Sequence, residues 1–324
     1  MKRRRFLKAV GAAGGASFLG FGGARGQAVG QSRGHPPGVA DRLVILHTND
    51  THSRMDPFPM DGGPFQGLGG AARRATLIRR VRDANEHVLL LDSGDILQGT
   101  PYFNFFGGEV EFRAMTAMGY DVATLGNHDF DNGVDGLARM LPLADFEFVS
   151  ANYDVSGTPL SDRVRPYTVR EIAGVKVGIF GLGIGFQGLV LSDLHEGVTY
   201  NDPVPAARQV TEALRAAGCS LIVCLSHLGY RYTDSSRPSD QTLAAAVPGI
   251  DLILGGHTHT FLDQPDIVRH EEGRPTLISQ MGWGGMRLGR VDVAVGDGDQ
   301  PPQWSAAGYP IDPALDGAHP VNLA

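Results

Sequence analysis

The sequence has few cysteines and no excess of basic residues. Cys219 and Cys224 are its two cysteines, and they flank a short apolar run. Their odd spacing would place them on opposite faces of a strand, so we expect two buried free thiols and no disulfide between them. The formal net charge is −7. This charge argues against binding to a nucleic acid polymer, because such modules depend on a basic surface.

Long hydrophobic runs are also absent. Residues 1–28 begin with a basic stretch and continue with a Gly- and Ala-rich stretch that is only modestly apolar. The Arg3-Arg4 pair, followed by Phe6 and Leu7, resembles a twin-arginine export signal. A short membrane anchor is the alternative, but the run is too short and too rich in glycine to cross a bilayer stably. We therefore expect an exported, periplasmic or extracytoplasmic protein with no stable membrane span.

The rest of the chain alternates apolar runs with segments of helical spacing. This alternation predicts an α/β fold in one domain over residues 42–296, after a polar linker at 29–41 and before a tail or packing arm at 297–324. The predicted strands are 43–46, 88–91, 121–125, 147–150, 175–182, 221–226, 250–254, 276–279 and 287–295. The predicted helices are 70–85, 109–118, 134–143, 205–217 and 239–247.

Polar side chains with ligand chemistry follow five of these predicted strands. The five segments are His47-Thr48-Asn49-Asp50-Thr51-His52, Asp92-Ser93-Gly94-Asp95, Gly126-Asn127-His128-Asp129-Phe130-Asp131, Ser226-His227 and Gly255-Gly256-His257-Thr258-His259. Each segment alone is weak evidence for a metal site, because Asp-x-His and Gly-Asp also occur as ordinary capped turns and a lone His usually has a structural role. The carboxyl ends of parallel strands meet at one edge of a sheet, so the five together predict one site.

The residue types at these strand ends favour a dinuclear metal site. Carboxylate, imidazole and amide oxygen together suit Mn, Zn, Fe or Mg rather than copper or an iron–sulfur cluster. Seven ligands are too many for one ion, and they suit two ions bridged by a carboxylate, which is the arrangement of two-metal phosphoryl transfer. The predicted ligands are Asp50, His52, Asp95, Asn127, His227, His257 and His259.

The same motifs resemble the calcineurin-like metallophosphoesterase superfamily. The longer forms at 47–52, 94–100 and 126–131 are similar to its 5′-nucleotidase branch, and the resemblance covers about residues 43–295. It implies a four-layer αββα sandwich with two divalent metal ions at the sheet edges. One ion would take Asp50, His52, Asp95 and His259, and the other Asp95, Asn127, His227 and His257, with Asp95 as the bridge.

The resemblance also assigns a catalytic pair. His128 would contact the transferring phosphoryl group, and Asp131 would orient its imidazole and keep it protonated, since a carboxylate partner raises the pKa of a histidine. Asp131 could equally cap the turn before Asn132-Gly133. The aromatic loop 101–106 beside the predicted site is either a docking or substrate-lid surface or ordinary core packing.

The two-domain members of this branch carry a C-terminal domain that binds the nucleotide, and this sequence ends before such a domain. We therefore expect either a small-molecule phosphate ester simpler than a nucleotide or a separate C-terminal-domain protein as partner, and we favour the partner. The leading prediction is metal-dependent hydrolysis of 5′-nucleotides or related derivatives. A sulfur-ester or phosphodiester hydrolase with the same metal site is an alternative. A non-catalytic metal-binding subunit is disfavoured, because both His128 and Asp131 are present.

Overall fold

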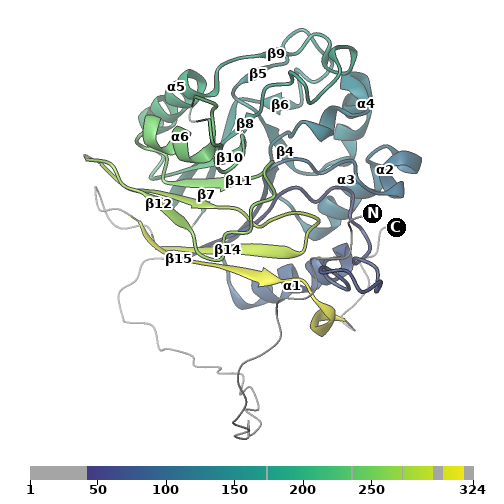
Figure 1. Ribbon diagram of the computed structural model, residues 1–324. Coiled ribbons are helices and arrows are strands. Elements are labelled where there is room, and N and C mark those ends of the chain that lie inside the picture. The colour runs from purple at the N-terminus through teal and green to yellow at the C-terminus, as the bar shows by residue number, and fades with distance from the viewer. Residues whose placement is uncertain (1–41, 173, 235, 272, 295–301, 317–324) are drawn as a thin grey trace, which may run out of the picture. The chain divides into compact units, whose positions relative to one another are not determined.

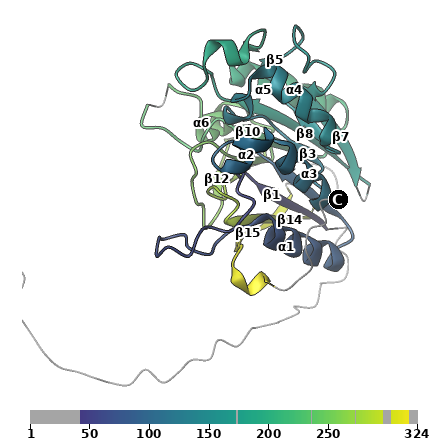
Figure 2. The same cartoon turned by 90° about the vertical axis from the view of Figure 1, so that its right-hand side faces the viewer.

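The computed structural model describes residues 42–172, 174–234, 236–271, 273–294 and 302–316. The predicted export signal and linker lie outside these residues. Two β-sheets form the centre of the fold, and helices cover the outer face of each (Figure 1). This arrangement is the predicted four-layer αββα sandwich, and Figure 2 shows it from the side. None of the helices in the described ranges has the length and apolar character needed to cross a membrane.

Within the described residues, the first sheet has seven strands and the second has six. In spatial order, the first contains β15 (Gln303–Pro310), β14 (Arg287–Ala294), β1 (Leu43–Thr48), β2 (Val88–Asp92), β3 (Val122–Ala123), β4 (Glu147–Val149) and β6 (Val164–Arg165). The second contains β12 (Asp266–Val268), β13 (Thr276–Ser279), β11 (Leu252–Gly255), β10 (Leu221–His227), β8 (Val175–Gly183) and β7 (Tyr167–Ile172). A short pair joins β5 (Tyr153–Asp154) to β9 (Thr199–Tyr200).

Parallel pairing runs through the middle of each sheet. In the first sheet β1, β2, β3, β4 and β6 are parallel, β14 pairs antiparallel with β1, and β15 pairs antiparallel with β14. In the second sheet β8, β10, β11 and β13 are parallel, with β7 and β12 antiparallel at its edges. The carboxyl ends of the parallel strands therefore point to the same side of each sheet.

The two-residue period of the strands sorts their side chains into layers. Leu43 and Ile45 of β1 pack between the two sheets, whereas Val44 and Leu46 face the helices outside the first sheet. Strands buried on both faces are continuously apolar, which explains the runs seen in the sequence. The helices on the first sheet are α1 (Ala71–Ala84), α2 (Pro101–Phe106), α3 (Glu109–Met118) and α4 (Gly133–Met140), and those on the second are α5 (Pro203–Ala216) and α6 (Asp240–Ala246).

Strands β5, β6, β7, β9 and β12 were not predicted from the sequence, and three further local features differ from the sequence-based expectations. The aromatic stretch 101–106 is a short helix, α2, and not a loop. Strand β15 lies within the predicted tail and pairs along its whole length with β14. Cys219 and Cys224 are buried and free as predicted, but both pack in the same cluster outside the second sheet, because Cys219 precedes β10 instead of lying in it.

Candidate active site

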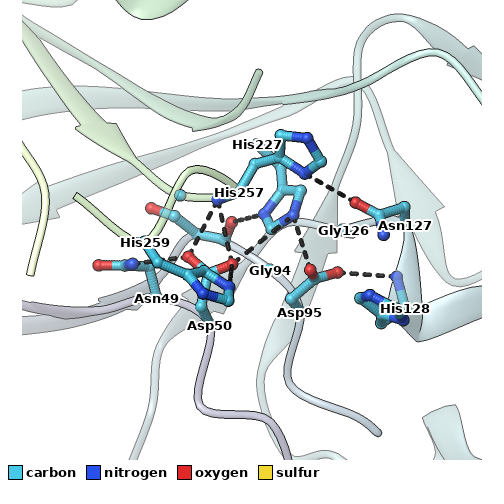
Figure 3. Close-up of polar contacts among 12 residues, drawn as sticks. Asn49, Asp50, Gly94, Asp95, Gly126, Asn127, His128, His227, His257 and His259 are labelled. Carbon is cyan, nitrogen blue, oxygen red and sulfur yellow. Dashed lines mark hydrogen bonds and ion pairs between the residues drawn. The ribbon is translucent and has the colours of Figure 1, made fainter. Parts of the chain in front are cut away.

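Five strand ends from the two sheets meet at one site. β1, β2 and β3 of the first sheet lead to Asp50, Asp95 and Asn127, while β10 ends at His227 and β11 leads to the 257–259 loop (Figure 3). The side chains of all seven predicted ligands lie in this region, in two neighbouring groups that could each hold a metal ion. The sequence predicted this meeting point, although it is built from two sheets that face each other.

The first group consists of Asp50, His52 and His259, whose ligand atoms all lie within 4.8 Å of one another. The Nε2 atoms of the two histidines are 3.0 Å apart, and His259 Nε2 is 3.4 Å from Asp50 Oδ1. The remaining ring nitrogen of His52 is buried and has no hydrogen-bond partner. These donor atoms therefore face one another around a shared point, as ligands of one cation do.

The second group consists of Asp95, His227 and His257, with Asn127 beside it. His227 Nδ1 donates a hydrogen bond to the carbonyl oxygen of Ser93 at 2.7 Å, so Nε2 is the ring nitrogen that can bind a metal ion. That Nε2 is fully buried, lies 3.1 Å from Asp95 Oδ2 and makes no hydrogen bond. His257 Nδ1 lies 2.9 Å from Asn127 Oδ1. An unpartnered, buried imidazole nitrogen aimed at a carboxylate is the arrangement expected of a metal ligand.

Asp95 stands between the two groups. Its Oδ2 is 3.1 Å from His227 Nε2 and 3.9 Å from His52 Nε2. Burial opposes ionisation, but the neighbouring His227 and His52 hold the pKa of Asp95 well below its usual range. Asp50 is likewise completely buried. Two buried carboxylates close together need positive charge beside them, so the donor set fits divalent cations.

The backbone at the site is held in an uncommon conformation. Five of the predicted ligands have positive φ angles between 49° and 70°, namely Asp50, His52, Asp95, His257 and His259. Such angles are unfavourable for residues with a Cβ atom and persist where the surrounding structure enforces them, most often at functional sites. Gly126 shows how tightly the site is packed, because a Cβ atom at this position would clash with Asp95 Oδ1.

Asp129 holds two of the ligand-bearing loops together. Its carboxylate accepts hydrogen bonds from four backbone N–H groups, at distances of 2.8–3.1 Å. The donors are Asp95, Ile96, Leu97 and Gly126. The loop after β2 and the loop after β3 are therefore tied to one buried side chain. Asp129 lies within the motif at residues 126–131, but nothing in the spacing of that motif indicates this role.

His128 lies at the rim of the site and pairs with Asp131. His128 Nδ1 donates a hydrogen bond to Asp131 Oδ2 at 2.8 Å, and the His128 side chain is 34% exposed. This hydrogen bond is the main reason that the pKa of His128 is raised. Asp131 does not cap α4, whose first turn lacks a side-chain cap. The geometry favours the orienting role of Asp131 over the turn-cap alternative.

One aromatic side chain stacks on a histidine of the site, and α2 carries further aromatic residues. The indole of Trp283 stacks on the imidazole of His259, with ring centroids 5.5 Å apart and planes 11° from parallel. On α2, Phe103 is buried while Phe105 is 81% exposed, so the stretch supplies both core packing and exposed apolar surface. The sequence offered no signal for Trp283, because an isolated tryptophan has no motif around it.

A sandwich of two sheets whose strand ends bring carboxylates, imidazoles and an amide to one point defines a metallophosphoesterase centre. The family model described as calcineurin-like phosphoesterase matches residues 43–261. The chain therefore belongs to the calcineurin-like phosphoesterase family.

Known proteins of this family resemble the chain over most of its length. A snake venom 5′-nucleotidase from Gloydius brevicauda is 36% identical over 275 residues, which cover 79% of this chain and 45% of that protein. The human 5′-nucleotidase is 33% identical, with coverage of 80% and 47%. The crystal structure of a 5′-nucleotidase precursor from Thermus thermophilus superposes with a TM-score of 0.76 at 32% identity, covering 85% of this chain and 55% of that one. The chain spans about half the length of these relatives.

Proposed function

We propose that the protein hydrolyses phosphate esters of nucleotides or related nucleotide derivatives with two divalent metal ions. Asp50, His52, Asp95 and His259 would hold one ion, and Asp95, Asn127, His227 and His257 the other. The observation that carries this proposal is the position of Asp95 between two groups of imidazoles, one of which contains the buried, unpartnered Nε2 of His227. The donor set accepts Mn, Zn, Fe or Mg.

The bound ions would supply Lewis acidity and an activated water for attack on phosphorus. The protein's own contribution begins with orientation, because the seven ligand side chains fix where the phosphate oxygens can lie. Because Asp131 holds the His128 imidazole through Nδ1, the other ring nitrogen, Nε2, would be the one that contacts the phosphoryl group. A protonated imidazole there would stabilise negative charge that develops on the phosphoryl group or its leaving oxygen.

The nucleotide part of the proposal rests on the relatives. Several similar proteins bear the name 5′-nucleotidase, and one from Bacillus subtilis is named a trifunctional nucleotide phosphoesterase and is 34% identical over 78% of this chain. Each relative also extends beyond the matched region. A second, independent proposal is that a separate protein, similar to the C-terminal domain of the two-domain members, takes part in selecting substrate.

The test is phosphate release by the purified chain after loading with manganese or zinc. AMP, UDP-glucose and p-nitrophenyl phosphate are offered as substrates, with and without metal. We expect turnover that depends on metal and that is abolished in Asp95→Asn. Asp83→Asn is the matched control, since Asp83 is an exposed acid on α1 and belongs to neither ligand group. Full activity of Asp95→Asn, or no turnover of any ester by metal-loaded protein, would refute the proposal.

We also propose export through the twin-arginine route. This proposal rests on the sequence of residues 1–28, which lie outside the described residues. Replacing Arg3 and Arg4 together by lysine keeps the charge and removes the arginine pair. We expect the full chain to reach the periplasm of a bacterial host and the double variant to remain inside the cell. Equal export of both would contradict the proposal.

A further inference from the structure

A cavity of about 330 Å³ opens beside the metal-binding edge of the second sheet. It is lined by residues that follow β8, by β9 and by residues that follow β10, namely Ile184, Gly185, Gln187, Leu189, Tyr200, Leu228, Arg237 and Pro238. Its volume falls within the roughly 300–1,000 Å³ typical of small-molecule pockets. None of the proposed metal ligands lines it, so the cavity is a separate feature of the site region.

Contacts place this cavity next to the ligand loops. Leu228, which lines it, directly follows the proposed ligand His227. The loop after β10 also touches the loop that carries His257 and His259, because the N–H of Tyr230 donates to Thr258 Oγ1 at 2.9 Å. The cavity is therefore bordered by the loop that begins directly after one proposed metal ligand and that contacts the loop carrying two others.

Arg237 is the charged group of the cavity, and its guanidinium is positioned in advance. The guanidinium carbon lies 3.9 Å from the ring centroid of Tyr232, and the Tyr232 hydroxyl donates to the Leu228 carbonyl at 2.7 Å. Among the described residues, the Arg237 side chain makes no ion pair and no hydrogen bond to a protein group. No acidic residue lines the cavity. Its N–H groups are thus available to a ligand that supplies hydrogen-bond acceptors.

The other walls favour a flat, partly apolar ligand. The Tyr200 ring is 37% exposed and lies over Gly185, where an added Cβ atom would be 3.5 Å from two of its ring carbons. Ile184, Leu189 and Leu228 supply aliphatic surface. Aromatic and aliphatic walls suit a heteroaromatic ring, which stacks on its faces and accepts hydrogen bonds at its edge. If the cavity held a second phosphate group instead of a ring, these apolar walls would have no apolar surface to contact.

We propose that this cavity is a nucleobase subsite, in which Tyr200 contacts the base and Arg237 donates hydrogen bonds to its edge. This inference rests on the proposed nucleotide hydrolysis and names where the leaving nucleoside is held. The arginine side chain has hydrogen-bond donors and no acceptor, so it pairs with the adjacent O6 and N7 acceptors of a 6-oxopurine such as guanine. Adenine carries an amino group in place of O6, and this donor cannot accept a hydrogen bond from arginine. The subsite therefore prefers GMP over AMP.

The test compares substrates that differ only in the base. Ribose 5-phosphate has the same scissile ester and sugar as GMP but no base, and kcat/KM is measured for both with metal-loaded protein. We expect Arg237→Ala to lower kcat/KM for GMP about tenfold, equivalent to one good bidentate pair, and to leave ribose 5-phosphate within about twofold. Leu189→Trp, which fills the cavity and keeps the arginine, gives the same selective loss. Arg231→Ala is the matched control, because Arg231 also lies over a tyrosine of this loop but does not line the cavity.

A second measurement separates this inference from the proposed function. Saturation-transfer NMR with guanosine and metal-free protein detects the base subsite without any hydrolysis. Guanosine binding by the wild type that is lost in Arg237→Ala and in Leu189→Trp supports the subsite even if no ester is turned over. Hydrolysis with unchanged ratios of GMP to ribose 5-phosphate in both variants overturns it while leaving the hydrolase intact. A loss confined to substrates that carry a second phosphate overturns it as well.

Discussion

The indole ring of Trp283 lies nearly parallel to the imidazole ring of His259, with the ring centroids 5.5 Å apart. The protein restrains the His259 side chain less than that of Asp50 in the same ligand group, because 40% of the His259 side chain is exposed while Asp50 is fully buried. Trp283 is itself braced by Phe58 and Phe65, whose rings meet it edge to face. The stack therefore restrains an exposed side chain that is a proposed metal ligand.

Removing this stack should weaken metal binding at the first group. We expect Trp283→Ala to lower the affinity of that site about 10- to 100-fold, the usual cost of losing a residue that orients a ligand. Trp283→Phe keeps an aromatic face and should retain most of the affinity. Metal content after dialysis against a weak chelator measures the effect. Two tightly held ions in Trp283→Ala would show that His259 needs no such support.

The carboxylate of Asp129 offers a second test. In Asp129→Asn one carboxylate oxygen becomes an amide NH₂, which then faces backbone N–H groups that have lost their acceptor. Each buried donor left without a partner costs about 1–3 kcal/mol, so we expect the free energy of unfolding to fall by about 3 kcal/mol or more. Denaturant titration measures it, with Asp135→Asn on the exposed face of α4 as control. A stability equal to that of the control would mean that these hydrogen bonds contribute little.

Asp131 should matter for turnover and not for metal content. Asp131→Asn preserves an acceptor for His128 Nδ1 but removes the negative charge beside the imidazole. We expect kcat to fall about tenfold or more, because each 1.4 kcal/mol of lost transition-state stabilisation slows the reaction about tenfold. The two metal ions should remain bound, as measured by elemental analysis. Loss of metal from this variant would instead place Asp131 in the support of the metal site.

The stability of the metal-free protein should depend on Asp240. Burial raises the pKa of this carboxyl to about 8, although the Ser226 hydroxyl donates a hydrogen bond to it. In the unfolded chain the carboxyl has its ordinary pKa of 3.8. The contribution of Asp240 to the free energy of unfolding is therefore fully present below about pH 4 and is lost as the pH rises through 8. While only the unfolded chain is ionised, the loss is about 1.4 kcal/mol per pH unit.

Asp240→Asn removes this ionisation and keeps the size of the side chain. We expect its unfolding free energy to vary less between pH 5 and pH 8 than that of the wild type, in urea titrations with a chelator present. A second oxygen of Asp240 is buried without a hydrogen-bond partner, so an exchange to amide loses no contact at that position. Parallel pH profiles for the two proteins would show that Asp240 keeps an ordinary pKa.

The sequence predicted the strand ends well, and the residues that it proposed as ligands lie together at them, because both have strong local patterns. Buried parallel strands are continuously apolar, and the ligand motifs follow them directly, as at β1 and β10. The short helix α2 was missed, because six residues are too few to show helical periodicity. Edge strand β15 was missed as well, since alternate exposed positions and flanking Pro and Gly residues are equally typical of a surface arm.

The parts of the site that the sequence could not predict depend on distant contacts. Trp283 meets His259 across a loop, and Arg237 lines its cavity together with residues from three separate segments. Asp129 is more instructive. Asp129 lies within the motif at residues 126–131, but only the structure shows that its carboxylate accepts hydrogen bonds from the loop after β2. Spacing along the chain indicates which residues share a strand end, whereas it does not indicate which side chain holds two loops together.

The pairing of His52 with His259 joins positions 207 residues apart. Most of the described chain must be synthesised before both histidines are available. The two sheets must then pack against each other to bring them together. Metal uptake is thus expected as the last event of maturation, after the slow, long-range contacts have formed. A protein exported in the folded state would complete that event in the cytoplasm, so the metal supply of that compartment would decide which ions it carries.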